Sequence, residues 1–342
     1  LHFMKKIINW GFIGLGNASL NLAKEFENLD NSNLLAVASH QEKKRILYKE
    51  KFKLNNKNIF SDYESIFKHP EVDIIYISLP NSLHEKYCFM ALEYNKNILV
   101  EKPITKNLIN FKRLKKSFIE KKLLLEEGTA NKFHPFYQQV LNEIHNIDYT
   151  SILKIRSSFG NDALGGKKFF GLRFKKINHK KALFNKKLDG GSILDGGMYP
   201  ISLLIDILYL YKKNFTNNYI IQNCKKKKSN GVDIASSINI SFNQIEIEFQ
   251  TSLIDNLKNN FEIHTNNEII IFKDIFTINE NSSITFKKNH HKNIYNKNIY
   301  FYEIKEISNF LINKKIYQND QSFNSLNKLE DKIELLSSWF IY

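Results

Sequence analysis

The stretch IINWGFIGLGNAS, residues 7–19, decides the fold that we expect for this chain. Residues 7–13 form an apolar run of strand length, and residues 18–29 carry apolar side chains at helical spacing. The turn between them reads GxGxxS, one step from the GxGxxG/A fingerprint. Gly14 permits a tight turn, and Gly16 lets a pyrophosphate approach the backbone and the N–H groups of the following helix. An ordinary glycine turn is the alternative, but the position after a first strand favours dinucleotide binding.

The pattern that begins at residue 7 continues to about residue 130. Further strands are expected at 34–39, 72–78, 97–100 and 123–127, and helices at 42–52, 82–94 and 108–120. Strands that alternate with helices are typical of βαβ units and a parallel, doubly wound sheet. We therefore expect a Rossmann domain of the α/β class over residues 4–128.

Beyond residue 130 the pattern changes. Strands are expected at 151–159, 219–223, 234–242, 245–252, 261–265, 268–272 and 283–286, and helices at 136–145, 203–211, 302–312 and 326–340. Turn residues between short strands indicate a mostly antiparallel sheet of about six strands. We expect a second, α+β domain over residues 129–342.

Length and composition agree with a two-domain globular protein. The chain has 342 residues, of which 42% are hydrophobic and 25% charged. No apolar run reaches the roughly 18 residues of a transmembrane helix, and residues 1–6 lack the features of a signal peptide. The two cysteines, Cys88 and Cys224, stand outside any metal-ligand spacing, so we expect free thiols in the cytoplasm.

The net charge of +15 raises the question of nucleic-acid binding. Lysine is spread along the whole chain, whereas a binding face groups basic residues with aromatic platforms or within a known module. The one tight cluster, Lys225 to Lys228, is expected to be a solvated hairpin tip rather than a phosphate-binding patch. We expect neither nucleic acid nor a membrane as a partner.

The end of the second expected strand selects the cofactor. NAD-binding proteins place a carboxylate there for the ribose 2′-hydroxyl, whereas this chain has Ser39, His40 and Gln41, with Lys43 to Arg45 just beyond. A 2′-phosphate would meet no repulsion and would find hydrogen-bond donors. The pattern favours NADP over NAD. The alternative is that these basic residues are only the solvated face of the next helix.

Two more segments follow parallel strands, at the sheet edge where ligands bind. Residues 78–84 read SLPNSLH; Pro80 stops the strand, and Asn81 or Ser82 can cap a helix. His84 by itself is more typical of a structural first-turn residue than of a catalytic one. Residues 101–104 read EKPI, and folding does not require a lysine at that position.

These segments together resemble the glucose–fructose oxidoreductase, inositol dehydrogenase and MocA family, and within it the dihydrodiol and xylose dehydrogenase branch. The resemblance rests on WGFIGLGN at 10–17, LPNSLH at 79–84, EKP at 101–103, KFHP at 132–135, GGSILDGGMYP at 190–200 and GVD at 231–233. EKP and GGxxxDxGxY at this separation are specific for the family.

The resemblance implies a cofactor domain followed by an open-faced sheet with helices on one face. It implies catalysis by Lys102, Asp195 and Tyr199. The residues expected to bind the cofactor are Gly14, Leu15, Gly16, Asn17, Ala18, Ser39, His40, Leu79, Pro80, Asn81, His84, Glu101 and Lys102. Three departures stand out: Ser19 replaces a small apolar residue, Lys132 stands where arginine is common, and Ala130 replaces a bulkier aromatic.

The residues themselves support part of this assignment. Asp195 and Tyr199 are four apart, although the glycines at 196–197 and Pro200 favour a break between them, with Pro200 starting the next helix. Tyrosine has a pKa of about 10, and a nearby ammonium such as that of Lys102 would favour its phenolate. The alternative is that Tyr199 is a core aromatic and Asp195 a helix cap.

The sequence thus predicts an oxidoreductase that uses NADP or NAD on a sugar, polyol or cyclic diol. A non-catalytic, cofactor-binding regulator on the same fold is the alternative, since fold alone does not decide function. We find no metal signature. Apolar residues on both alternations of the strands at 234–272 predict an uncovered apolar face, and with it a homodimer or dimer of dimers. The substrate and the direction of the reaction are left open.

Overall fold

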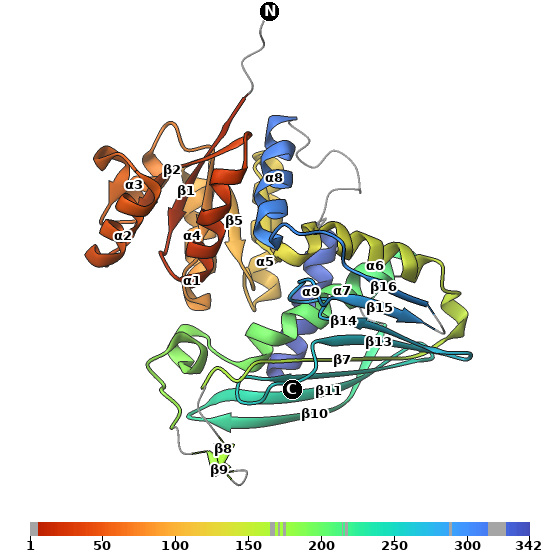
Figure 1. Ribbon diagram of the computed structural model, residues 1–342. Coiled ribbons are helices and arrows are strands. Elements are labelled where there is room, and N and C mark those ends of the chain that lie inside the picture. The colour runs from red at the N-terminus through yellow and green to blue at the C-terminus, as the bar shows by residue number, and fades with distance from the viewer. Residues whose placement is uncertain are drawn as a thin grey trace, which may run out of the picture. The chain divides into compact units, whose positions relative to one another are not determined.

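The computed structural model describes residues 6–164, 168–169, 172–173, 176–213, 215, 218–286, 289–313 and 326–342. The chain forms two compact units (Figure 1). The first unit comprises residues 1–105, 109–134 and 297–326, and the second comprises 106–108, 135–296 and 327–342. The expected division at residue 128 differs from these units chiefly in that residues 129–134 and 297–326 group with the first unit.

The first unit contains a six-stranded sheet in the order β3-β2-β1-β4-β5-β6. Its strands are β1 (Ile8–Ile13), β2 (Ser32–Ala38), β3 (Ile59–Phe60), β4 (Ile74–Ile77), β5 (Asn97–Glu101) and β6 (Leu125–Gly128), and they pair in parallel. The connecting helices are α1 (Asn17–Ala23), α2 (Glu42–Phe52), α3 (Glu64–Lys68), α4 (Asn81–Glu93) and α5 (Leu108–Glu120). The predicted doubly wound Rossmann sheet is confirmed. The strand order reverses between β1 and β4, which is where such sheets bind ligands.

Helix α8 (Ile299–Ile312) returns to the first unit from far along the chain. Ile304, Ile307 and Leu311 join the apolar core formed by β1 and β2. The indole Nε1 of Trp10 donates a hydrogen bond to Ser308 Oγ at 3.1 Å. Apolar residues at helical spacing therefore attach this remote segment to the first strand of the sheet.

The second unit contains an eight-stranded sheet in the order β10-β11-β12-β7-β13-β14-β15-β16. Its strands are β7 (Ile152–Gly160), β10 (Tyr219–Ser229), β11 (Val232–Phe242), β12 (Ile245–Ser252), β13 (Asn260–Thr265), β14 (Ile269–Lys273), β15 (Ser283–Phe286) and β16 (Asn289–Lys292). β12 and β7 pair in parallel, and the other pairs are antiparallel. The sheet is larger than the predicted six strands, but its mostly antiparallel character is confirmed. A separate two-stranded sheet joins β8 (Lys168–Phe169) and β9 (Leu172–Arg173).

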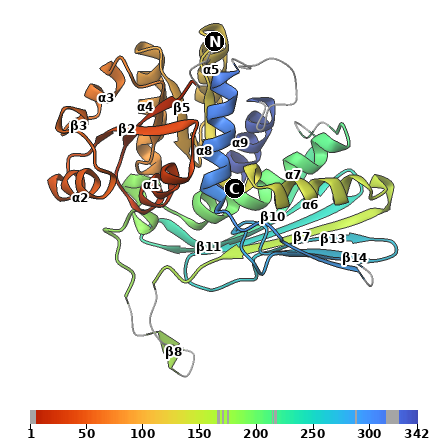
Figure 2. The same cartoon turned by 45° about the horizontal axis from the view of Figure 1, so that its top comes forward.

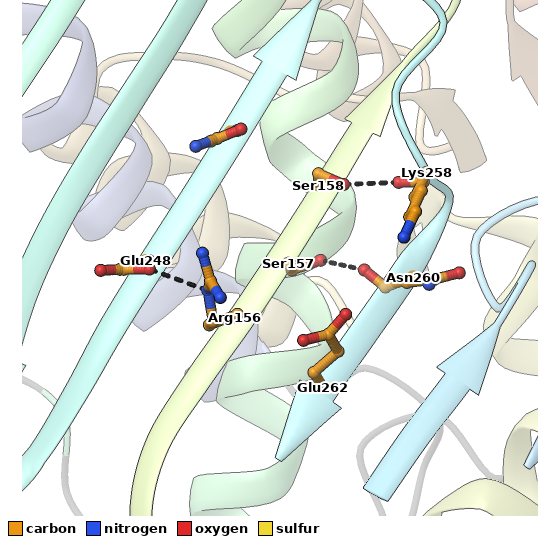
Figure 3. Close-up of a pocket in the computed structure, with 8 residues that line it drawn as sticks. Arg156, Ser157, Ser158, Glu248, Lys258, Asn260 and Glu262 are labelled. Carbon is orange, nitrogen blue, oxygen red and sulfur yellow. Dashed lines mark hydrogen bonds and ion pairs between the residues drawn. The ribbon is translucent and has the colours of Figure 1, made fainter. Parts of the chain in front are cut away.

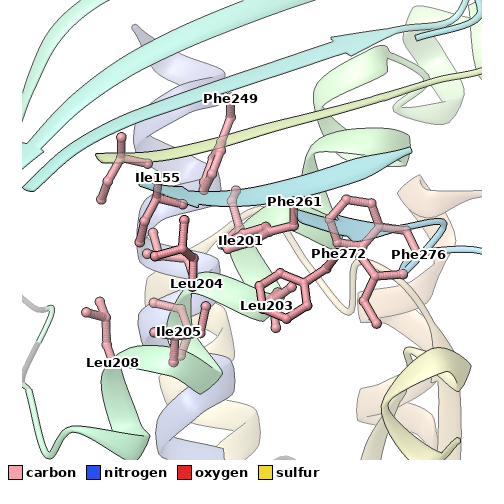
Figure 4. Close-up of a cluster of buried hydrophobic side chains, with 14 of the residues drawn as sticks. Ile155, Ile201, Leu203, Leu204, Ile205, Leu208, Phe249, Phe261, Phe272 and Phe276 are labelled. Carbon is pink, nitrogen blue, oxygen red and sulfur yellow. The ribbon is translucent and has the colours of Figure 1, made fainter. Parts of the chain in front are cut away.

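Helices α6 (Pro135–His145), α7 (Met198–Leu210) and α9 (Leu326–Ile341) cover one face of this sheet (Figure 2). The core between helices and sheet is aromatic and branched aliphatic; Leu204 of α7 and Phe249 and Phe261 of the sheet belong to it (Figure 4). Burial of so many large side chains supplies the main driving force for folding of this unit. The open-faced architecture implied by the resemblance is confirmed.

The β11–β12 hairpin corrects one sequence prediction. Ile238 pairs with Phe249 and Ile240 with Ile247, and all four side chains belong to the same buried core. Directly paired residues of an antiparallel hairpin share a face, so even numbers on β11 and odd numbers on β12 point the same way. The opposite face of these two strands carries Ser237, Asn239, Ser241, Glu246, Glu248 and Gln250. The expectation of apolar residues on both faces here is wrong, and the predicted dimer loses that argument.

The basic cluster Lys225 to Lys228 is a second correction. These residues belong to β10 and pair with β11, and the turn follows at Asn230 and Gly231. They are not a hairpin tip. β10 is an edge strand, and lysines on such a strand discourage pairing with other chains.

Residues 186–210 are apolar and long enough to cross a membrane by length and composition alone. In the structure, 78% of the most apolar 18-residue stretch of this segment is buried inside the protein. The high hydropathy of this segment is therefore explained by its place in the core of the second unit.

Candidate cofactor site and catalytic segment

The glycine turn after β1 has the close packing that its sequence predicts. Gly14 adopts a φ of +83°, and a Cβ atom built on it would lie 2.2 Å from the carbonyl oxygen of Ser78. A built Cβ on Gly16 meets nothing within 4 Å, so the space beside this backbone is open. Helix α1 starts at Asn17 with no side-chain hydrogen bond from its N-cap residue. This turn therefore fits a bound pyrophosphate, with only glycine possible at position 14.

Ser19, the departure from the fingerprint, is fully buried and hydrogen-bonded. Its hydroxyl donates to the carbonyl oxygen of Gly16 at 3.0 Å and accepts from the Tyr48 hydroxyl at 2.9 Å. Burial raises the pKa of Tyr48 to about 12, so this phenol stays protonated and keeps donating. Serine at this position thus links α1 to α2 without disturbing the turn.

The end of β2 presents Ser39 and His40 as expected. Ser39 is buried, and its Oγ accepts a hydrogen bond from Gln41 N at 3.2 Å. Nδ1 of the exposed His40 lies 2.8 Å from the Ser61 carbonyl oxygen, and its ring contacts that of Tyr63 in a tilted arrangement at a centroid distance of 4.4 Å. Arg45 Nη1 donates to the Ser39 carbonyl at 2.6 Å. Arg45 was outside the predicted site, although its position one turn into α2 brings a guanidinium to the strand end.

The segment after β4 starts helix α4 at Asn81, with Pro80 as its N-cap. His84 lies in the first turn and is fully buried. Its Nδ1 lies 2.8 Å from the carbonyl oxygen of Pro103, and its Nε2 lies 2.7 Å from that of Leu79. Burial lowers the pKa of His84. Both ring nitrogens therefore contact backbone, and the side chain joins the segments that follow β4 and β5.

Glu101 is the last residue of β5, which pairs with β4, and Lys102 follows it directly. Both are half-buried, and the hydroxyl of Tyr76 on β4 donates a hydrogen bond to Glu101 Oε1. Helix α8 contributes Glu303, which is 1% exposed. Burial, with the charges of Glu101 and Glu126, raises the pKa of Glu303 well above its usual value. This buried acid was missed because some 200 residues separate it from the EKP motif.

Ala130 and Lys132, two of the departures from the family pattern, lie in the short 3-10 helix Ala130–Phe133 that follows β6. Both residues are buried in the structure, Ala130 with 7% and Lys132 with 4% of its surface exposed.

In the second unit, Asp195 and Tyr199 lie on one continuous helical segment. Residues Ile193–Gly197 form a π-helical turn, and α7 continues from Met198. The predicted break between the two residues is therefore wrong. Pro200 has no N–H to complete an α-helical bond to residue 196, and a π-turn accommodates that missing bond. Asp195 and Tyr199 are both half-buried between fully buried neighbours, which indicates a shared accessible side.

Tyr199 also borders the apolar core. Its ring lies 4.9 Å from that of Phe159 and 5.8 Å from that of Phe276, measured between centroids. These contacts fix the ring at the boundary between core and surface. Lys102 belongs to the first unit, and Asp195 and Tyr199 belong to the second.

A polar pocket lies on the outer face of the sheet, between β12, β7 and β13 (Figure 3). Its polar groups are paired within the sheet: Arg156 Nε lies 2.9 Å from Glu248 Oε2, and Ser158 Oγ donates to the Lys258 carbonyl at 2.6 Å. Among the residues that the structure describes, no three His, Cys, Asp or Glu side chains gather in a way that holds a metal ion.

Comparison with known proteins agrees with this geometry. Residues 8–129 match the model of a family described as an oxidoreductase family with an NAD-binding Rossmann fold. The chain is 27% identical to trans-1,2-dihydrobenzene-1,2-diol dehydrogenase of Xenopus tropicalis over 204 residues, which are 57% of this chain and 55% of the relative. It is 25% identical to D-xylose 1-dehydrogenase (NADP(+)) of Hypocrea jecorina over 215 residues, 59% of this chain and 53% of the relative. The matched region thus spans about half the length of these curated relatives.

The fold extends further than the sequence match. A 3-ketoreductase from Actinomadura kijaniata, solved in complex with NADP and TDP-benzene, superposes with a TM-score of 0.81 at 17% identity, covering 98% of both chains. The glycine turn, the parallel sheet and these matches define a Rossmann domain of the NAD-binding type. Residues 8–129 thus match the model of the glucose–fructose oxidoreductase, inositol dehydrogenase and MocA family, the family that their motifs resemble.

Proposed function

We propose that this protein is an NAD(P)-dependent oxidoreductase that transfers a hydride between nicotinamide and a secondary alcohol or carbonyl of a sugar, polyol or cyclic diol. One observation carries the proposal: the GxG turn after β1 and Glu101-Lys102 at the end of β5 lie at the carboxyl edge of one parallel sheet. That edge is where this kind of sheet binds its ligand. The names of the dihydrodiol and xylose dehydrogenase relatives supply the substrate class.

The residues present fit a nicotinamide dinucleotide. Position 14 admits only glycine, and the space beside Gly16 is open to a pyrophosphate. The strand end at 39–41 carries no carboxylate, and the guanidinium of Arg45 is bound beside it. A 2′-phosphate would be attracted there, so we propose NADP as the preferred cofactor and NAD as the second choice. When bound, the cofactor supplies the hydride chemistry.

The protein then has to hold the substrate and move a proton. We assign proton transfer at the substrate hydroxyl to the phenolic oxygen of Tyr199. The Lys102 ammonium would lower the pKa of that phenol in the assembled site, since a nearby positive charge favours the phenolate. The Asp195 carboxylate would accept a hydrogen bond from the substrate or orient Lys102. These roles are carried over from the family motif, residue by residue.

The test is a turnover assay on the full chain. NADP⁺ or NAD⁺ is incubated with D-xylose, other aldoses, polyols and trans-1,2-dihydrobenzene-1,2-diol, and formation of the reduced cofactor is followed by its absorbance. Turnover with at least one member of the panel, faster with NADP⁺, supports the proposal. Tight binding of NADPH without turnover of any member would instead favour a cofactor-binding regulator.

We also propose a cellular compartment and an oligomeric state for this protein. Cys88 and Cys224 are both free thiols, which fits a reducing compartment such as the cytoplasm. Assembly into a homodimer or dimer of dimers stays part of the proposal. Light scattering at micromolar concentration tests it, and a monomer would contradict it.

A further inference from the structure

Asp233 connects a sheet strand to the start of the segment that carries Asp195 and Tyr199. It lies on β11 and is 5% exposed. Its Oδ2 accepts two hydrogen bonds, from Ser192 Oγ at 2.8 Å and from the backbone N–H of Ile193 at 2.8 Å. Ser192 is the N-cap of the π-turn and Ile193 its first residue, so a side chain from 40 residues away caps this helical segment.

Packing around the carboxylate leaves it little freedom. Gly191 has a φ of +143°, and a Cβ built on it would lie 2.3 Å from Asp233 Oδ1. On the other side, Thr251 Oγ1 donates to the carbonyl oxygen of Ser192 at 2.7 Å. A Cβ on Gly196 would in turn lie 2.5 Å from that Thr251 oxygen. Strands β11 and β12 thus hold the N–H and the C=O groups at the start of the segment from two sides.

This cap requires burial of a carboxylate, which costs desolvation free energy that an exposed cap does not. Burial raises the pKa of Asp233, while the hydrogen bonds from Ile193 and Ser192 lower it. A surface residue can cap a helix without that desolvation, as Asp148 does. Asp148 is exposed, and its carboxylate accepts hydrogen bonds from Thr150 N at 3.0 Å and Thr150 Oγ1 at 2.7 Å. We therefore infer that the buried cap on β11 fixes the position of the helical segment more than it adds to the stability of the fold.

The position that it fixes is that of the catalytic segment. π-turns are rare and occur mostly at functional sites, and this one contains Asp195. Where the turn begins determines in which direction residues 195 and 199 point. We propose that Asp233 is a positioning residue that sets the orientation of Asp195 and Tyr199 for the reaction. The inference rests on the proposed function.

The test compares Asp233→Ala with Asp148→Ala, a control that removes a two-bond carboxylate cap from an exposed site. Misplacement of reacting groups by about 1 Å can cost ~100-fold in rate, so we expect kcat to fall about 10- to 100-fold in Asp233→Ala. The affinity for NADPH should stay unchanged, because its predicted contacts lie in the first unit. Asp233→Asn keeps an oxygen acceptor and should recover much of the loss. Asp148→Ala should behave like the wild type.

A double mutant separates positioning from general damage. If Asp233 acts through Tyr199, Asp233→Ala should reduce kcat little further in a Tyr199→Phe background. Equal losses in both backgrounds, or a normal kcat in the single mutant, would overturn the inference. Should Asp233→Ala fail to fold, Ser192→Ala provides the comparison, since it removes one of the two hydrogen bonds that Asp233 accepts and should lower kcat in the same way.

Amide hydrogen exchange keeps the inference testable if no substrate in the panel is turned over. Residues 193–199 should exchange faster in Asp233→Ala than in the wild type or in Asp148→Ala. Unchanged exchange there would overturn the positioning role. Faster exchange without any turnover would leave the cap established and count against the proposed function instead.

Discussion

The Nδ1 atom of His84, in the first turn of α4, lies 2.8 Å from the carbonyl oxygen of Pro103, just past the end of β5. The other ring nitrogen lies 2.7 Å from the Leu79 carbonyl. One fully buried side chain therefore ties together the two segments that follow β4 and β5. Pro103 is adjacent to Lys102, so the contact bears directly on where that lysine is held.

Replacing His84 by alanine should loosen both segments. A neutral ring donates one hydrogen bond to these carbonyl oxygens; losing that bond and the ring volume should lower the free energy of unfolding by about 2–4 kcal/mol. NADPH binding should also weaken, because both segments border the predicted cofactor site. Urea denaturation and a fluorescence titration with NADPH measure the two effects. Unchanged stability and unchanged NADPH affinity in His84→Ala would show that the contacts of His84 contribute to neither.

The pH dependence of stability gives His84 a second test. Because burial lowers its pKa in the folded state, the unfolded chain takes up a proton more readily below about pH 6.5. Stability contributed by this residue is thus present at neutral pH and is lost as the pH falls toward the folded pKa. The loss of stability between pH 7 and pH 5 should be smaller in His84→Ala than in the wild type. Equal slopes would contradict the assignment.

Glu303 should shape stability in the opposite pH direction. Its pKa in the folded state is raised well above the usual value, chiefly by burial. The folded state therefore holds a proton that the unfolded chain releases, and stability declines as the pH rises above about 4.5. Glu303→Gln keeps the size without the charge, so its unfolding midpoint in urea should decline less between pH 5 and pH 8. Glu306→Gln, on the same helix but half-exposed, is the matched control. A parallel decline in wild type and Glu303→Gln would refute this.

Cofactor preference should depend on the end of β2. We expect NADPH to bind more tightly than NADH, with a margin that shrinks as salt is added, because part of the preference is charge attraction. Ser39→Asp should reverse the order by repelling the 2′-phosphate, and Arg45→Ala should reduce the preference. Fluorescence titrations with both cofactors at two salt concentrations measure this. Equal affinities in the unmodified protein would defeat the argument.

The sequence could predict those parts of the site that are formed by consecutive residues. Three segments are of this kind: the glycine turn at 14–16, the EKP segment and the GGxxxDxGxY segment. Each is a short run of residues next to a single strand or helix. Their local geometry follows from glycine freedom and from the edge of a parallel sheet. The same locality explains why the alternation of β11 and β12 was misjudged, since the pairing of 238 with 249 depends on the hairpin register.

The sequence could not predict contacts between residues that are far apart in the chain. Helix α8 was expected at 302–312, but nothing in its pattern says that it returns to β1, or that Glu303 comes near Glu101. The cap formed by Asp233 on Ile193 likewise spans 40 residues. Such contacts depend on tertiary packing, which a single periodicity does not encode.

The last prediction concerns catalysis by Lys102 and Tyr199. Lys102→Ala removes the positive charge that is proposed to lower the pKa of Tyr199, and Tyr199→Phe removes the proton carrier while keeping the ring that packs on Phe159 and Phe276. Both variants should still bind NADPH but turn over about 100-fold more slowly, the usual scale for loss of general acid–base catalysis. If the two groups act as a unit, the double mutant should be little worse than either single mutant.

The pH profile of turnover distinguishes this mechanism from a simple loss of structure. The rising basic limb should disappear in Tyr199→Phe, because no phenol is left to ionise, whereas a misfolded fraction would only scale the profile down. Near-normal turnover in Tyr199→Phe would mean that another group moves the proton. His84 is an unsuitable replacement, because both of its nitrogens contact backbone carbonyls. His134 is buried, and its ring makes an edge-to-face contact with Tyr302 at a centroid distance of 4.8 Å. Burial lowers the pKa of His134 to about 4, so it stays neutral at pH 7 and would be the histidine to substitute next.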